Sequence, residues 1–193
     1  MCRWRTARNY LAGLVAGDGS LTKYQRTHDY YIEVYDADRN FLEQVIREIR
    51  IALKVNAKII SPKNRSYYKL RISNKELFMV ISELIRKRLR SPTKAFIRGI
   101  IDAEGTVYVD KKGRVALEIA NTDKLIIDAV HKYLERHRIH HTVTTHRGRG
   151  NRRAILKVRI RGWDNVEKVL NLVKPNHPKI ILKFTKLKSL LKK

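Results

Sequence analysis

Two similar segments of the chain each end in an acidic residue followed by glycine. The first reads YLAGLVAGDG over residues 10–19 and the second reads FIRGIIDAEG over residues 96–105, so the acids are Asp18 and Glu104. Each acid is predicted to close a helix, where the helix dipole disfavours a carboxylate by roughly 0.3–1 kcal/mol. A bound divalent cation would remove that penalty, so these residues point to metal-dependent chemistry.

The two segments form an internal repeat, because Gly13, Asp18 and Gly19 align with Gly99, Glu104 and Gly105. Small residues recur at spacings of three and four in both copies, and such a face allows two helix backbones to approach closely. We therefore expect the two helices to pack against each other and to bring the acids together. Packing of the small residues onto a sheet is the alternative explanation. The small residues are Ala12, Gly13, Ala16 and Gly17 in the first copy, and Gly99 and Ala103 in the second.

Similar patterns follow each copy of the segment. Alternation of apolar and polar residues predicts strands, and apolar residues at helical spacing predict helices. The expected helices span residues 6–17, 75–89, 163–173 and 178–191, with Thr6 as the first cap and further helices around 41–49 and 125–134. The expected strands span residues 31–35, 57–60, 67–73, 106–110, 115–119, 141–146 and 155–161.

The predicted fold class is α+β, with two pseudo-twofold related αββαββα halves, each carrying a four-stranded antiparallel sheet. The halves are assigned to residues 1–91 and 92–193 and are expected to form one body. The basic stretch 86–90 is expected to join them, with Ser91 as the cap of the next helix and Pro92 in its first turn.

Hard oxygen ligands are predicted around the two acids. Gly19 and Gly105 are expected to be left-handed helix caps, which would leave the carbonyl oxygens of Gly17 and Ala103 free. Two carboxylates, two carbonyls, phosphate oxygens and water suit Mg²⁺, whereas zinc would require histidine or cysteine, which the repeated segments lack.

The charge of the chain indicates its partner. Its 193 residues include 43 lysine and arginine residues against 18 aspartate and glutamate residues, a formal net charge of +25. Such an excess predicts a nucleic acid as the partner. No run of 18 apolar residues occurs and residues 1–10 lack the apolar stretch of a signal peptide, so we expect no membrane contact and a cytoplasmic protein. Cys2 is the single cysteine, which excludes an intramolecular disulfide.

On these residues the chain resembles the LAGLIDADG homing endonucleases, in particular the monomeric members with two motifs. The resemblance covers essentially the whole chain and rests on two acid-glycine motifs, each opening a matching half. It implies that the two sheets form a DNA-binding saddle with the motif helices at their interface. It also implies Mg²⁺-dependent cleavage of both strands of a long double-stranded DNA site across the minor groove, with short 3′ overhangs. Two or three divalent ions are expected, with Mn²⁺ as a substitute and Ca²⁺ binding without cleavage.

The resemblance implies further catalytic residues in each half. Family members carry glutamine or asparagine after the second strand of a half, where it orients a catalytic water. Asn121 matches this position, whereas the first half carries Asp36, which either holds water as well or makes the two strand cuts unequal. A basic residue near the active centre also recurs in the family. Arg90 and Lys174 are the best matches, with Lys23 as a further candidate, and ordinary phosphate contact is the alternative for each.

Polar residues that alternate with apolar ones along the strands are candidates for base contacts. Two sheets of ~33 Å each would cover about twenty base pairs, and the unlike halves predict an asymmetric target. Basic loops would clamp phosphates at the ends. The candidate DNA-binding residues are Lys23, Tyr31, Glu33, Tyr35, Lys69, Arg71, Tyr108, Arg114, Arg147, Arg149, Arg152, Lys157, Arg159 and Arg161.

Three alternative functions remain at this point. An RNA maturase on the same fold would bind its own intron RNA, and it would be separated from a nuclease by a cleavage assay with Mg²⁺. A structural RNA-binding protein would explain the charge but leaves the two acid-glycine helix ends unexplained. An intein-embedded nuclease is disfavoured because the chain begins with Met1 and lacks a final splicing His-Asn. A free-standing, intron-encoded monomer from a prokaryotic or organellar source is expected, with a composition compatible with heat adaptation.

Overall fold

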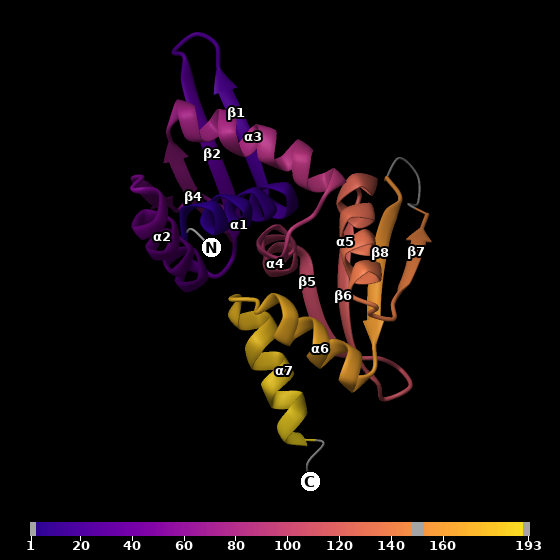
Figure 1. Ribbon diagram of the computed structural model, residues 1–193. Coiled ribbons are helices and arrows are strands. Elements are labelled where there is room, and N and C mark those ends of the chain that lie inside the picture. The colour runs from indigo at the N-terminus through magenta and orange to yellow at the C-terminus, as the bar shows by residue number, and fades with distance from the viewer. Residues whose placement is uncertain (1–2, 148–152, 191–193) are drawn as a thin grey trace.

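Two αββαββα halves lie on either side of a central pair of helices, α1 and α4 (Figure 1). The computed structural model describes residues 3–147 and 153–190. The first half contains α1 (Arg3–Asp18), β1 (Gly19–Tyr24), β2 (Asp29–Asp36), α2 (Arg39–Leu53), β3 (Ala57–Ile60), β4 (Tyr68–Ser73) and α3 (Lys75–Arg90). The second contains α4 (Lys94–Glu104), β5 (Gly105–Val109), β6 (Val115–Asn121), α5 (Lys124–Arg136), β7 (Thr142–His146), β8 (Ile155–Arg161) and α6 (Trp163–Val173), and α7 (Pro178–Leu190) follows.

The two sheets have the same topology. Their strand orders are β1-β2-β4-β3 and β5-β6-β8-β7, and every neighbouring pair is antiparallel. Gly19 pairs with Val34 in the first sheet, and Gly105 pairs with Ile119 in the second, so the registers are also equivalent. The predicted α+β fold with two four-stranded halves is confirmed.

The motif helices α1 and α4 pack side by side through glycine. A Cβ atom on Gly13 would lie 2.1 Å from the carbonyl oxygen of Phe96, and one on Gly99 would lie 2.4 Å from the carbonyl oxygen of Tyr10. Only glycine permits such backbone contact. Because residue 13 meets residues 96 and 99 while Gly17 meets Ala103, the helices run in the same direction and end together. The expected helix pairing is confirmed.

The core lies between the helices and one face of each sheet. Ile32 and Val34 of β2 are buried, and so are Leu117 and Ile119 of β6, as period-two alternation predicts. Four helix starts are fixed by side chains that accept a backbone N–H from the first turn, which is the role of an N-cap. These caps are Asp38 for α2, Asn74 for α3, Thr93 for α4 and Asp123 for α5.

Two expected helix boundaries are wrong. Thr6 is not a cap, because α1 already begins at Arg3 and Thr6 lies inside it. At this end of the helix, the guanidinium of Arg8 extends over the ring of Trp4, which lies one turn before it. The basic stretch 86–90 is not a connection but the last turn of α3, where cations favour the helix dipole. Ser91 ends that helix through its N–H to Lys87, and Thr93 instead caps α4.

The expectation that Gly19 and Gly105 are left-handed caps is also wrong. Gly105 has φ −72° and ψ 139°, an extended conformation open to any residue. The reason for glycine is space: a Cβ atom on Gly19 would lie 2.5 Å from the carbonyl oxygen of Glu33, and one on Gly105 would lie 2.4 Å from that of Ile101. Glycine therefore lets each strand start flush against the end of its helix.

The last helix, α7, has no counterpart in the first half. It packs beside β5 and α6, at the lower edge of the molecule in Figure 1. Ile180 is fully buried next to Gly105, and Phe184 stacks on Trp163 with ring centroids 4.6 Å apart. In the described part of the chain, no helix is both long enough and apolar enough to cross a bilayer.

Replacing Gly13 by alanine tests the helix contact. The added Cβ must push α1 and α4 apart, so we expect Gly13→Ala to lower the free energy of unfolding by about 3 kcal/mol or more. Gly113→Ala is the control, because nothing lies within 4 Å of its Cβ position and only its φ of +74° is strained, at a cost of ~1–2 kcal/mol. Equal losses for the two variants in denaturant titrations would contradict the packing described.

Candidate functional site

The two motif acids lie side by side at the ends of α1 and α4. A Cβ atom on Gly17 would lie 2.6 Å from the Cβ of Ala103 and 3.9 Å from Oε1 of Glu104. Asp18, the next residue, is therefore adjacent to Glu104, and the close approach of the helices is what joins the acids. Both are the last residues of their helices, as expected.

The acid pair carries unbalanced negative charge. Burial raises the pKa of Glu104 to about 7, and the charge of Asp18 adds to this rise. Burial also raises the pKa of Asp18; Lys179 and His177 oppose the rise, whereas Asp36 adds to it. Raised pKa values of two neighbouring carboxylates are typical of a site that is completed by a cation.

Asn121 and Asp36 occupy equivalent places at the ends of β6 and β2. In each, Oδ1 accepts a hydrogen bond of 2.7 Å from the backbone N–H two residues further on. The other side-chain atom differs: Nδ2 of Asn121 donates to Glu104, whereas Oδ2 of Asp36 lies 3.0 Å from Nε2 of His177. The second half thus has an acid–amide pair, and the first half has two acids.

His177 balances the acid at position 36. The backbone N–H of Lys179 donates to Nδ1 of His177 at 3.1 Å, so Nε2 carries the hydrogen and donates to Asp36. The ring stacks on Phe41 at 4.1 Å between centroids. Although burial opposes it, this hydrogen bond holds the pKa of Asp36 below its usual value.

A buried carboxylate holds this segment in place. Asp102 is fully buried on α4 and accepts the backbone N–H groups of Asn176 and His177 at 2.9 and 3.0 Å. It also accepts the hydroxyl of Tyr10 at 2.8 Å. Asn176 in turn donates to Glu48 of α2, so the segment links both halves.

Lys179 is the basic residue that the structure brings to the acids. Its Nζ donates to the carbonyl oxygen of Ala103 at 2.7 Å, so that oxygen is not free as expected. Sequence reasoning missed both Lys179 and His177 because they follow the repeated elements of the second half and have no repeat partner. The available signal was Asp102, an acid among apolar residues of a motif helix, which requires buried partners.

The three basic residues expected near the centre lie elsewhere. Arg90 ends α3 near the start of α4, a helix of 11 residues that is ~16 Å long, so Arg90 is at the far end from Glu104. Lys23 contacts the ring of Tyr30 on the sheet face that α3 covers. Lys174 is an exposed left-handed residue after α6.

An open groove of about 780 Å³ runs from Asp18 and Asp36 along α7. It is lined by Asp18 and Asp36, by Tyr35 of β2, and by lysines 179, 183 and 186 on one side of α7. The groove therefore combines the acidic centre with a basic wall.

Most of the predicted base-contacting residues lie on the sheet faces that the helices leave open. In the first sheet Tyr31, Tyr35, Lys69 and Arg71 share that face, and in the second Tyr108, Lys157, Arg159 and Arg161 do. Arg114 pairs with Asp110 at 3.0 Å in the β5–β6 turn, and Arg147 is exposed after β7. Arg149 and Arg152 lie outside the described residues.

Glu33 is the exception on the open face. It is only 5% exposed, and its two carboxylate oxygens accept hydrogen bonds, one from Arg71 and the other from Tyr35. Its carboxylate is thus turned toward protein donors instead of solvent. Sequence reasoning also missed Glu118, which is held in the same way in the second sheet.

The donor set suits a hard cation shared with a phosphate ligand. Among the described residues, no group of three or more His, Cys, Asp or Glu side chains is arranged to hold a metal alone. Asp18 and Glu104 supply carboxylate oxygens, and Gly17 lies in the last turn of α1 next to Glu104. Mg²⁺ is commonly held by one or two carboxylates with water and substrate phosphates, so two acids fit it.

Comparison with known proteins gives matches over both halves. A family model of the LAGLIDADG-like domain matches residues 5–86 and again residues 91–174. The homing endonuclease I-DmoI of Desulfurococcus mucosus is 28% identical over 144 residues, which cover 69% of this chain and 72% of that protein. The homing endonuclease I-ApeI of Aeropyrum pernix is 29% identical over 124 residues, 54% of each protein, so this chain spans about half of that relative's length.

Solved structures match the fold. I-DmoI in complex with DNA and Mn has a TM-score of 0.70 at 23% identity, covering 90% of this chain and 99% of that chain. I-DmoI in complex with DNA and Ca has a TM-score of 0.66 at 25% identity, covering 87% and 91%. The likeness extends over both sheets and the helix pair.

Glu104 predicts a pH-dependent stability of the metal-free protein. An unfolded chain ionises this carboxyl near 4.5, whereas the folded chain keeps its proton up to about 7, so stability falls as the pH rises through that window. In the presence of a chelator at pH 8, Glu104→Gln should therefore raise the free energy of unfolding by about 1 kcal/mol, after allowance for solvent screening. This corresponds to a rise in melting temperature of ~2–4 °C. At pH 4.5 the substitution should change the melting temperature little.

Glu83→Gln, on the exposed side of α3, is the matched control and should behave alike at both pH values. A Glu104→Gln effect that is equal at pH 4.5 and pH 8 would show that the carboxylate is not penalised by its surroundings.

Proposed function

The chain belongs to the family of LAGLIDADG-like domains, and on this premise we propose that it is a site-specific homing endonuclease. It hydrolyses one phosphodiester in each strand of a long, asymmetric double-stranded DNA target and leaves short 3′ overhangs. Its gene lies in an intron. The match to two named homing endonucleases supports this assignment.

The proposal rests on the acid pair at the tips of α1 and α4. Asp18 and Glu104 come from different halves, adjoin each other, and lie where β1 and β5 begin. The open faces of both sheets, with their lysine and arginine residues, start from the same point. A duplex lying across both sheets therefore has its centre at the two acids, which is the position needed to cut both strands.

Divalent cations suit this pair of acids, and we propose Mg²⁺ as the natural ion, with two or three bound. When bound, the ions would supply hydroxide from water and neutralise the leaving 3′ oxygen. Asp18 and Glu104 would hold them together with the Gly17 and Ala103 carbonyls. The complexes of I-DmoI with Mn and with Ca support the use of divalent ions.

Residues around the acids set their orientation and charge. Asn121 fixes one oxygen of Glu104 through its amide and leaves the other for a ligand. Lys179 reduces the repulsion between the acids while its ammonium holds the Ala103 carbonyl, and it must leave that oxygen if a cation takes it. Its position at the acid pair makes Lys179 the candidate for the basic residue of the active centre.

DNA binding uses the open sheet faces and the basic side of α7. Residues 1–91 and 92–193 each bind one half of the target, and their different side chains make it asymmetric. One chain carries both acids, so a monomer suffices for double-strand cleavage. A chain of +25 neutralises many phosphates, so affinity falls steeply with added salt.

Removing either acid tests the assignment. Asp18→Asn and Glu104→Gln should each lower double-strand cleavage with Mg²⁺ by about 10²-fold or more, because an amide cannot replace a carboxylate ligand. Binding in Ca²⁺, measured by gel shift on the same duplex, should change by less than about tenfold. The target is first obtained by cleavage selection from a randomised DNA library.

Asp128→Asn is the matched control, since Asp128 is a surface residue paired with Lys124 on α5. Normal cleavage by either acid variant would refute the site, and loss of cleavage in Asp128→Asn would show that the assay responds to charge alone.

The unlike partners of the acids predict unequal strand cuts. Asn121 donates to Glu104, whereas Asp36 cannot donate to Asp18 and repels it. We expect the two single-strand rate constants to differ, and Asp36→Asn to bring them closer by restoring the amide. Strand-specific end labels on one duplex report both rates, with Asp128→Asn as the control. Equal rates in the unaltered chain, or an unchanged ratio in Asp36→Asn, would refute this role.

A further inference from the structure

Each sheet carries one glutamate at the same place on its open face. Glu33 pairs in register with Ser20, and Glu118 pairs with Thr106. Ser20 and Thr106 both follow the motif glycines, so the two glutamates are equivalent under the pseudo-twofold relation. On the next strand, Glu33 faces Arg71 and Glu118 faces Arg159.

The first cluster consists of Glu33, Lys69, Arg71 and Tyr35. Oε1 of Glu33 accepts a bond from Nε of Arg71 at 2.7 Å and lies 3.3 Å from Nζ of Lys69. Oε2 accepts the Tyr35 hydroxyl at 2.6 Å. The guanidinium carbon of Arg71 also lies 4.5 Å from the ring centre of Tyr31, which fixes the guanidinium from a second side.

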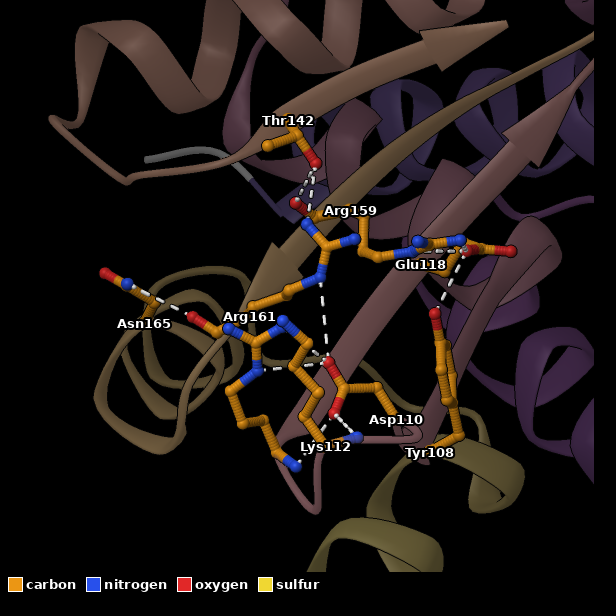
Figure 2. Close-up of polar contacts among 9 residues, drawn as sticks. Tyr108, Asp110, Lys112, Glu118, Thr142, Arg159, Arg161 and Asn165 are labelled. Atoms are coloured by element: carbon orange, nitrogen blue, oxygen red, sulfur yellow. Dashed lines mark hydrogen bonds and ion pairs between the residues drawn. The ribbon is translucent and has the colours of Figure 1, made fainter. Parts of the chain in front are cut away.

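The second cluster repeats the glutamate, arginine and lysine. Nζ of Lys157 donates to Oε1 of Glu118 at 2.8 Å. Nε of Arg159 donates to Oε2 at 2.7 Å (Figure 2). The hydroxyl of Tyr108 donates to Oε2 at 3.1 Å. The tyrosine therefore comes from β5 here and from β2 in the first cluster, whereas the other three residues are equivalent.

These carboxylates are unexpected on a surface that binds phosphate. The chain has 18 acidic residues against 43 basic ones, yet one acid stands in the middle of each cationic face. Although burial opposes it, the hydrogen bonds from the tyrosine and the cations hold the pKa of each glutamate below its usual value, so both are charged at neutral pH. Each thus weakens attraction for phosphate and instead fixes the orientation of an arginine.

A fixed guanidinium is suited to reading guanine. Arginine recognises the O6 and N7 atoms of guanine with two parallel N–H groups, and a carboxylate on Nε leaves the terminal nitrogens for that contact. Among the described residues, neither terminal nitrogen of Arg71 makes a protein hydrogen bond. Arg159 also donates Nη2 to Glu118, which leaves Nη1 fully available.

We propose that Arg71 and Arg159 each read one guanine, with Glu33 and Glu118 as their positioning residues, so that an otherwise asymmetric target contains one inverted-repeat G·C pair. The two base pairs lie at equal distances from the cleavage centre, with the guanines on opposite strands. This inference rests on the proposed function. The preference is stricter in the half read by Arg71, because both of its terminal nitrogens remain for the base.

Selection from a randomised duplex library tests the proposal. The pool bound in Ca²⁺ and the pool cleaved in Mg²⁺ are sequenced in parallel, and both should be enriched in guanine at the two symmetric positions by about 10- to 100-fold over other bases. A bound pool without such a pair overturns the inference. A bound pool with the pair but no cleaved pool supports it and refutes the nuclease instead.

Variants assign each position to its cluster. Glu33→Gln should relax guanine preference at one position and leave the symmetric one intact, and Glu118→Gln should do the reverse. Arg71→Lys keeps the charge but lacks the parallel N–H groups of the guanidinium. It should therefore lose the guanine preference at the target position that Glu33→Gln affects, while retaining its affinity for DNA at a given salt concentration. Asp110→Asn, on the same face of the second sheet, is the control and should leave both positions unchanged.

Melting temperatures separate reading from stability. If Glu33→Gln and Glu118→Gln lower the melting temperature but leave the selected sequences unchanged, the clusters only hold the strands together and the inference is wrong. A loss of base preference at all target positions together would also contradict the inference.

Discussion

Backbone contact between α1 and α4 is the constraint on which the other features depend. At Gly13 and Gly99 the helices are so close that a single added carbon would lie 2.1–2.4 Å from a carbonyl oxygen of the other helix. The same approach continues to Gly17, so the helices end together and their acids must adjoin. It also sets the two sheets on either side of one axis, and strands β1 and β5 start next to that axis. The position of the acids and the arrangement of the two sheets therefore both follow from this helix contact.

Bringing two carboxylates together creates repulsion, which a segment outside the repeat offsets only in part. Asp102 holds residues 176–177 by their backbone, and this anchor directs His177 to Asp36 and Lys179 to the carbonyl of Ala103. The segment joins the halves at the point where their acids meet. It also makes the centre unequal, because Asp36 stands where the second half has Asn121, and Asp36 pairs with His177 whereas Asn121 pairs with the motif acid Glu104.

The open sheet faces show the same combination of symmetry and difference. Glu33 and Glu118 hold an arginine and a lysine at equivalent register positions, while the tyrosine of each cluster comes from a different strand. The shared part follows from the common register of the two sheets, which places these residues alike. The tyrosine breaks this equivalence, so the surroundings of the two arginines differ.

The sequence by itself determined the two halves, the helix pair, the acids Asp18 and Glu104, and the strand faces, because each depends on local periodicity or on a repeat visible within one segment. Tertiary structure alone decided the rest. Gly105 is extended, so a positive φ is not the reason for glycine at this position. The reason is the carbonyl oxygen of Ile101, which leaves no space for a Cβ atom. Lys179, and not Arg90, lies at the acids. The sequence does not reveal this, because a contact across 76 residues leaves no trace in local spacing. The partners of a buried group such as Asp102 are likewise known only when the chain has folded.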